Sequence, residues 1–231
     1  TTLMGHGLDA YRQEPKLTTS GIQFVQGSTQ SQYDKILRPS SDPFQKTGGL
    51  KQLHGNLGTG MIKISAVAPE RHVIEAPARV FADQESVKEA FKAGEFTGDT
   101  VVVVRFQGPR SNGMPELHGL TPVLSVLQDR GLKVALVTDG RMSGASGKIP
   151  AAIHISPEAA LGGTLAKVRD GDVIRVDATN GTLDVMVEDL EDRSNATIDL
   201  SQNSAGLGRE LFDVFRENVG LSTNGACVAI R

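Results

Sequence analysis

Two runs rich in β-branched residues constrain the fold of this chain most strongly. Residues 100–106 and 133–138 are nearly continuous apolar stretches of the kind found in strands buried on both faces. Between them, residues 122–130 carry a helical pattern that ends at Gly131. A strand, a helix and a strand at this spacing predict a βαβ unit with parallel strands and a right-handed crossover.

Other segments add antiparallel hairpins and flanking helices to this unit. The Asn180-Gly181 pair between two alternating runs is the strongest short hairpin signal. Alternation or apolar runs predict strands at 61–67, 151–155, 173–177 and 182–187, and helical periodicity predicts helices at 83–92, after Pro157, and at 209–218. The combination predicts an α/β domain with a mixed, barrel-like or layered sheet.

The first fifty residues differ from the rest in their weak periodicity and polar character. Residues 18–20 and 26–32 are typical of loops or a short ribbon, and the prolines near residue 40 favour extended backbone. We therefore expect residues 1–50 to form a connector or arm, and residues 51–231 to form the folded domain.

Composition excludes several classes of function. The formal net charge of −3 lacks the clustered positive charge of a nucleic-acid-binding protein. No window approaches eighteen apolar residues, so no membrane span is predicted. Cys227 is the single cysteine, so it forms no internal disulfide and cannot by itself hold zinc or an iron–sulfur cluster. We expect a cytoplasmic protein.

Two glycine-containing loops follow the two predicted parallel strands. Residues 107–116 come after the first strand and residues 139–148 after the second, and each loop carries glycines, cations and oxygen-bearing groups. The carboxyl ends of parallel strands share one edge, where backbone N–H groups and basic side chains bind anions. The alternative is that both loops are simply turns.

Glu116 and Ser143 are the candidate reactive residues in these loops. A carboxylate at residue 116 suits a hard cation such as Mg²⁺, although it also suits the first turn of a helix. A serine hydroxyl is a poor base unless a metal or a cation lowers its pKa, so residue 143 is also explained as a serine in a turn.

The same loops resemble the signature of the dihydroxy-acid and phosphogluconate dehydratase family. The shared motifs are Gly108-Pro109, Gly113-Met114-Pro115-Glu116, Thr138-Asp139-Gly140-Arg141-Met142-Ser143-Gly144, and Gly55-Asn56-Leu57 followed by Lys63. The resemblance runs from about residue 37 to the end. It implies the swivelling β/β/α fold, with a barrel-like core flanked by helices. It also implies the carboxy-terminal half of a protein about twice as long.

The resemblance implies a hydro-lyase that removes water from a 2,3-dihydroxy acid. Within the family the chain looks most like the members that convert 6-phospho-D-gluconate to 2-dehydro-3-deoxy-6-phosphogluconate in the Entner–Doudoroff pathway. Glu116 is then the Mg²⁺ ligand, and Ser143 is the base that takes the C2 proton as an alkoxide. The C3 hydroxyl leaves to an iron–sulfur cluster, expected to be 4Fe-4S, held by the amino-terminal half.

The implied 6-phosphate requires binding groups in the same loops. The candidates are Arg110, Asn112, Arg141, Ser146 and Lys148, whose alternative role is solvated surface. Some sugar-acid members carry a threonine two positions after the serine, where this chain has Ala145, so that hydroxyl role does not transfer.

The expected partners are the amino-terminal half of the same enzyme, against which residues 1–50 pack, and a second copy in a homodimer. The isolated chain is expected to be inactive. The alternatives are a dihydroxy-acid or other sugar-acid dehydratase, and a non-catalytic domain for sugar-acid binding or assembly.

Overall fold

The computed structural model describes residues 2–3, 5–143 and 147–229. The chain divides into two compact units, residues 1–48 and 49–231. In the first unit, a 3-10 turn at Asp9–Tyr11 precedes an antiparallel hairpin of β1 (Gln13–Thr18) and β2 (Gly21–Gln26). The sequence placed its domain boundary between residues 50 and 51, and the units meet at Gly48 and Gly49.

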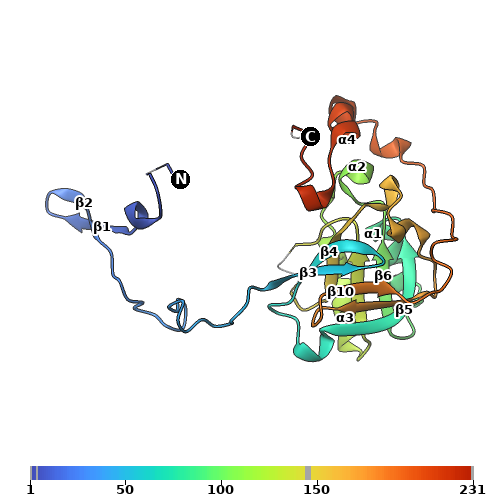
Figure 1. The fold of residues 1–231 in the computed structure, drawn as a ribbon, viewed down its shortest axis with the longest axis horizontal. Helices are drawn as coiled ribbons and strands as arrows, with labels where there is room; N and C mark the ends of the chain where they lie inside the picture. The colour runs from blue at the N-terminus through green and yellow to red at the C-terminus, as the bar shows by residue number, and fades with distance from the viewer. Residues whose placement is uncertain (1, 4, 144–146, 230–231) are drawn as a thin grey trace. The chain divides into compact units, whose positions relative to one another are not determined.

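The second unit is built on a closed barrel, in which the described residues form eight strands (Figure 1). The order around the barrel is β10-β3-β4-β8-β7-β6-β5-β9. The strands are β3 (Leu50–Gly55), β4 (Gly58–Lys63), β5 (Val73–Phe81), β6 (Thr100–Val104), β7 (Val134–Thr138), β8 (Ala151–Ser156), β9 (Val173–Asp177) and β10 (Thr182–Val185). Strands β5, β6, β7 and β8 are parallel neighbours, and β9 joins β10 and β5 with antiparallel pairing. The predicted α/β class with a mixed barrel is confirmed.

Short helices connect and flank these strands. The α-helices are α1 (Gln84–Lys92), α2 (Pro109–Asn112), α3 (Thr121–Asp129) and α4 (Asp213–Asn218). The 3-10 turns of the second unit are Pro69–Arg71, His118–Leu120, Ala159–Leu161, Thr164–Lys167, Ser201–Asn203, Arg209–Phe212 and Ser222–Asn224. No helix in the described part of the chain is long and apolar enough to cross a bilayer.

Strands β6 and β7 are buried on both faces, as their composition predicts. Val101 and Val103 point into the core inside the barrel. Val102 and Val104 instead belong to a second core, together with Val87 of α1 and the leucines of α3. These two strands therefore support both the barrel interior and the helical layer.

The structure corrects several predicted elements. The strand predicted at 61–67 is β4, which begins earlier and ends at Lys63. Only a 3-10 turn follows Pro157, and the predicted helix at 209–218 begins as a 3-10 turn before α4. Strand β5 was not predicted; its Pro77 is tolerated because pairing with β6 begins only at Ala78.

Candidate functional site

The loops after β6, β7 and β8 meet at one rim of the barrel. The last residues of β6 and β7, Val104 and Thr138, are paired in parallel register. Beyond them, Glu116 and Arg141 form a parallel bridge, and the N–H of Leu117 donates to the carbonyl of Arg141 at 3.1 Å. The parallel pairing thus brings together the two loops that the sequence singled out.

Glu116 connects the two loops through its carboxylate. Its Oε1 accepts the backbone N–H of Ser143 at 2.6 Å, and its Oε2 pairs with Nη1 of Arg141 at 3.2 Å. Arg141 also donates through Nε to the carbonyl of Met114 at 2.7 Å. The Glu116 side chain is 36% exposed, so its oxygens remain accessible to a ligand at the rim.

Asp139 holds the base of this rim from a fully buried position (0% exposed). Its two oxygens accept the N–H groups of Phe106 at 3.1 Å, Gln107 at 2.9 Å and Ala159 at 2.9 Å. Burial raises the pKa of Asp139 to about 6, while the three N–H groups oppose that rise. The sequence analysis gave this residue no role, although an aspartate directly after a buried strand is a usable signal.

Glu158 plays a similar role one loop further along the chain. This buried carboxylate (4% exposed) accepts the N–H of Arg110 at 2.9 Å and both the N–H and the hydroxyl of Ser111, at 3.3 and 3.1 Å. A Cβ at Gly108 would overlap the Glu158 carboxylate. Residue 108 must therefore be glycine for this close approach, and sequence reasoning missed Glu158 altogether.

Ser143 lines a small cavity of about 120 Å³. Among the described residues that line it, Lys63 at the end of β4 is the single charged one, and the remaining walls include Met142, Ile149 and Ile153. The small volume excludes a large ligand, and Lys63 is the lining group that could pair with an acidic one. Sequence reasoning noted Lys63 only as part of a motif.

The other predicted binding residues are divided between two places. Lys148 is exposed and stands between Gly147 and Ile149, which both line the Ser143 cavity. Arg110 lines a different cavity of about 250 Å³, together with Arg216 and other residues of the C-terminal segment. Ser146 lies outside the described residues.

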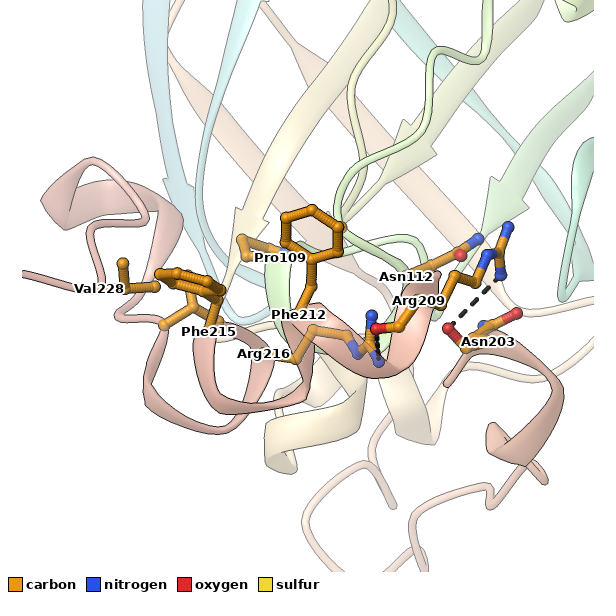
Figure 2. Close-up of a pocket in the computed structure, with 10 residues that line it drawn as sticks. Pro109, Asn112, Asn203, Arg209, Phe212, Phe215, Arg216 and Val228 are labelled. Carbon is orange, nitrogen blue, oxygen red and sulfur yellow. Dashed lines mark hydrogen bonds between the residues drawn. The ribbon is translucent and has the colours of Figure 1, made fainter. Parts of the chain in front are cut away.

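Asn112 also points away from the Glu116 contacts. Its Nδ2 donates to Oε1 of Gln107 at 3.0 Å, and it lines a cavity of about 310 Å³. Figure 2 shows Phe212 and Phe215 of the C-terminal segment at this cavity, with Pro109 beside them. The structure thus groups Glu116, Arg141 and Ser143, and it places Arg110 and Asn112 on α2 beside the C-terminal segment.

Two further residues near the rim, Arg105 and His154, have defined contacts. Arg105 donates to the carbonyls of Ala166 and Val168 at 3.1 and 2.9 Å, so it connects the end of β6 to the segment that follows β8. His154 is half-buried, has a φ of 58°, and lines a cavity of about 300 Å³. Burial and the nearby Arg141 charge lower the pKa of His154.

The residues present fit the two implied cofactors unequally. Glu116 offers one accessible carboxylate, which suits Mg²⁺ because this ion commonly uses one or two protein carboxylates. No group of three or more His, Cys, Asp or Glu side chains that could hold a metal occurs among the described residues. Cys227 is the single cysteine of the sequence, so this chain does not fit an iron–sulfur cluster.

Comparison with known proteins identifies the family to which the chain belongs. Residues 35–226 match the family model described as dihydroxy-acid/6-phosphogluconate dehydratase C-terminal. The chain belongs to this dehydratase family. Within it, the chain is 56% identical to the phosphogluconate dehydratase of Rhizobium meliloti (strain 1021) over 230 residues, and that match covers 98% of this chain and 38% of the relative.

Two further members of the dehydratase family help to place the chain within it. The phosphogluconate dehydratase of Pseudomonas aeruginosa is 56% identical, with 98% of this chain and 37% of the relative covered. The dihydroxy-acid dehydratase of Lachnoclostridium phytofermentans is 42% identical, with 72% of this chain and 30% of the relative covered. The chain therefore spans less than two-fifths of the length of these relatives.

Proposed function

We propose that this chain is the C-terminal part of a hydro-lyase that converts 6-phospho-D-gluconate to 2-dehydro-3-deoxy-6-phosphogluconate. The observation that carries the proposal is the contact between the two rim loops, in which Glu116 accepts the N–H of Ser143 at 2.6 Å. The extent of the match to phosphogluconate dehydratases, 98% of the chain against 72% for the dihydroxy-acid enzyme, supports the choice of substrate.

In this proposal Ser143 removes the C2 proton of the sugar acid. A serine hydroxyl acts as a base only when nearby positive charge stabilises its alkoxide. Lys63, in the same cavity, supplies one such charge. Mg²⁺ at Glu116 and a 4Fe-4S cluster held by the preceding part of the protein would add positive charge and a Lewis acid for the departing C3 hydroxyl.

The negative charges of the substrate require cations at the same rim. In this proposal Lys63, which lines the same cavity as Ser143, binds the carboxylate next to C2. Arg141 is already held by Glu116, and Lys148 is exposed close by, so both remain candidates for the 6-phosphate. Arg110 and Asn112 would reach the phosphate only from α2.

The first test is the substrate preference of the full-length protein that contains this chain. We expect faster turnover of 6-phosphogluconate than of 2,3-dihydroxyisovalerate, measured as 2-keto acid formed. Equal or faster turnover of the branched acid would instead assign a dihydroxy-acid dehydratase. No turnover of any sugar acid by the cofactor-loaded protein would favour a binding or assembly domain. The proposal also implies a cytoplasmic homodimer, which sedimentation and fractionation of the full-length protein test.

The role of Ser143 is tested by the Ser143→Ala variant of the full-length protein. Loss of a general base slows proton transfer by about 10²- to 10⁴-fold, so we expect C2 hydrogen exchange with solvent to fall at least that far. The cluster absorption spectrum should stay unchanged. Ser194→Ala, at an exposed position, is the control and should exchange normally. Normal exchange in Ser143→Ala would remove this serine as the base.

A further inference from the structure

The β1–β2 hairpin gathers most of its apolar side chains on one face. The cross-strand pairs Pro15–Phe24 and Leu17–Ile22 alternate with the pair Lys16–Gln23. Because successive side chains in a strand point to opposite sides, Pro15, Leu17, Ile22 and Phe24 share one face, which we term the apolar hairpin face. The other face carries Glu14, Lys16 and Gln23, together with the half-buried Val25.

The apolar hairpin face is open in the described chain. Leu17 is 85% exposed, Ile22 is 68% exposed and Phe24 is 66% exposed. A two-stranded ribbon is marginally stable alone and needs a third layer against its apolar face. Adjacent exposed apolar side chains backed by a polar face mark an interaction surface. We therefore expect a partner to cover these exposed apolar residues.

The position of the hairpin in the chain indicates what that partner is. The family model for the C-terminal domain begins at residue 35, so the hairpin precedes the matched domain. The R. meliloti relative aligns over 98% of this chain, which is too much to omit the hairpin, yet 62% of that relative (100% − 38%) lies outside the alignment. Elements that follow one another in sequence usually pack as neighbours.

We propose that the apolar hairpin face docks against the part of the polypeptide that precedes this chain in the full-length dehydratase. This inference rests on the proposed function only in that both treat the chain as part of a longer family member. The interface is apolar at its centre, with Phe24 and Ile22 from β2 beside Leu17 from β1. The lysine and glutamine of the opposite face remain in solvent.

Site-specific photo-cross-linking in the full-length protein tests this docking. A photoreactive phenylalanine analogue replaces Phe24 in one protein and Gln23, on the opposite face, in the matched control. Each protein is prepared as an equal mixture of ¹⁴N- and ¹⁵N-labelled copies, so that cross-links within one copy differ in mass from those between copies. We expect the probe at residue 24 to cross-link to residues upstream of this chain in the same copy, several-fold more often than the probe at residue 23.

Each other result would overturn the proposal. Cross-links to residues 49–231 would place the face on the barrel unit, and cross-links of mixed isotope would place it on a second copy. Equal yields from residues 23 and 24 would mean that the apolar face is not covered. None of these readouts uses substrate, so a failure of the proposed activity would leave them interpretable.

Limited proteolysis supplies a second measurement that needs no probe. Trypsin cleaves after Lys16, which lies in β1. We expect Phe24→Ser to speed this cleavage in the full-length protein at least tenfold, because the undocked hairpin opens readily, and Gln23→Ser to leave the rate unchanged. Wild-type cleavage rates in both variants would contradict docking through this face.

Discussion

Buried carboxylates determine how the rim loops are held at the scale of single residues. Asp139 and Glu158 accept N–H groups from the loops after β6 and β8, and neither was given a role from the sequence. Each satisfies backbone donors that burial would otherwise leave unpaired, at about 1–3 kcal/mol per group. Through these contacts the two buried carboxylates support the loops that carry the half-buried Glu116 and Ser143.

Replacement of Asp139 tests this support. In Asp139→Asn, the amide nitrogen cannot accept an N–H, so at least one buried donor is left unpaired. We expect a loss of about 2 kcal/mol in the free energy of unfolding at pH 7, measured with urea. Asp129→Asn, at the exposed end of α3, is the control and should stay within about 0.5 kcal/mol of wild type.

The same pair of proteins has a defined pH dependence. The pKa of Asp139 is raised from 3.8 to about 6 in the fold, so the folded state takes up a proton that the unfolded state does not between these values. Stability of the wild type relative to Asp139→Asn should therefore rise as pH falls, by about 2 kcal/mol from pH 7 to pH 4.5. A difference that is constant with pH would contradict the raised pKa.

Gly108→Ala tests the close approach between the β6 loop and Glu158. The new Cβ would overlap the carboxylate and displace it from the N–H groups of Arg110 and Ser111. We expect the free energy of unfolding, measured with urea or by heating, to fall by about 2 kcal/mol. Gly98→Ala, where nothing lies within 4 Å and φ is ordinary, should be neutral or slightly stabilising. Equal stability of the two variants would exclude steric selection at residue 108.

At the scale of elements, the sequence predicted those segments whose local pattern and burial agree. Strands β6 and β7 and helices α1 and α3 were predicted because continuous apolar runs, an aspartate cap and terminal glycines are local signals. Strand β5 was missed because its Pro77 is a negative signal, which the late start of the β6 pairing neutralises. Tolerance of Pro77 depends on tertiary structure, which a local pattern does not contain. The roles of Asp139 and Glu158 also depend on tertiary contacts, so the sequence did not indicate them.

Helix α1 offers a direct test of a local signal. Asp83 caps it by accepting the N–H of Ser86 at 2.8 Å. Asp83→Ala should lower the free energy of unfolding by about 1 kcal/mol, measured with urea. Glu89→Ala, exposed in the middle of the same helix, should change it by less than about 0.5 kcal/mol. A larger loss for the second variant would mean that the cap is not the dominant local contribution.

At the scale of the whole molecule, the proposed reaction centre requires more than this chain. The rim offers a carboxylate, a hydroxyl and cations, but the sequence contains a single cysteine. We expect reconstitution of this chain with iron and sulfide to give no visible cluster absorption, whereas the full-length protein treated identically should show it. A stoichiometric cluster on this chain alone would contradict the assignment of the cluster ligands to the preceding part.

The closure of the barrel has a consequence for assembly. Each barrel strand has a neighbour on both sides, and the shortest pairing is the single Thr182–His54 pair between β10 and β3, so the described barrel presents little open ladder to another protein. The outer edges of β1 and β2 are unpaired in the described chain. We therefore expect association by strand addition, whether in native assembly or in misassembly at high concentration, to begin at the hairpin and leave the barrel intact.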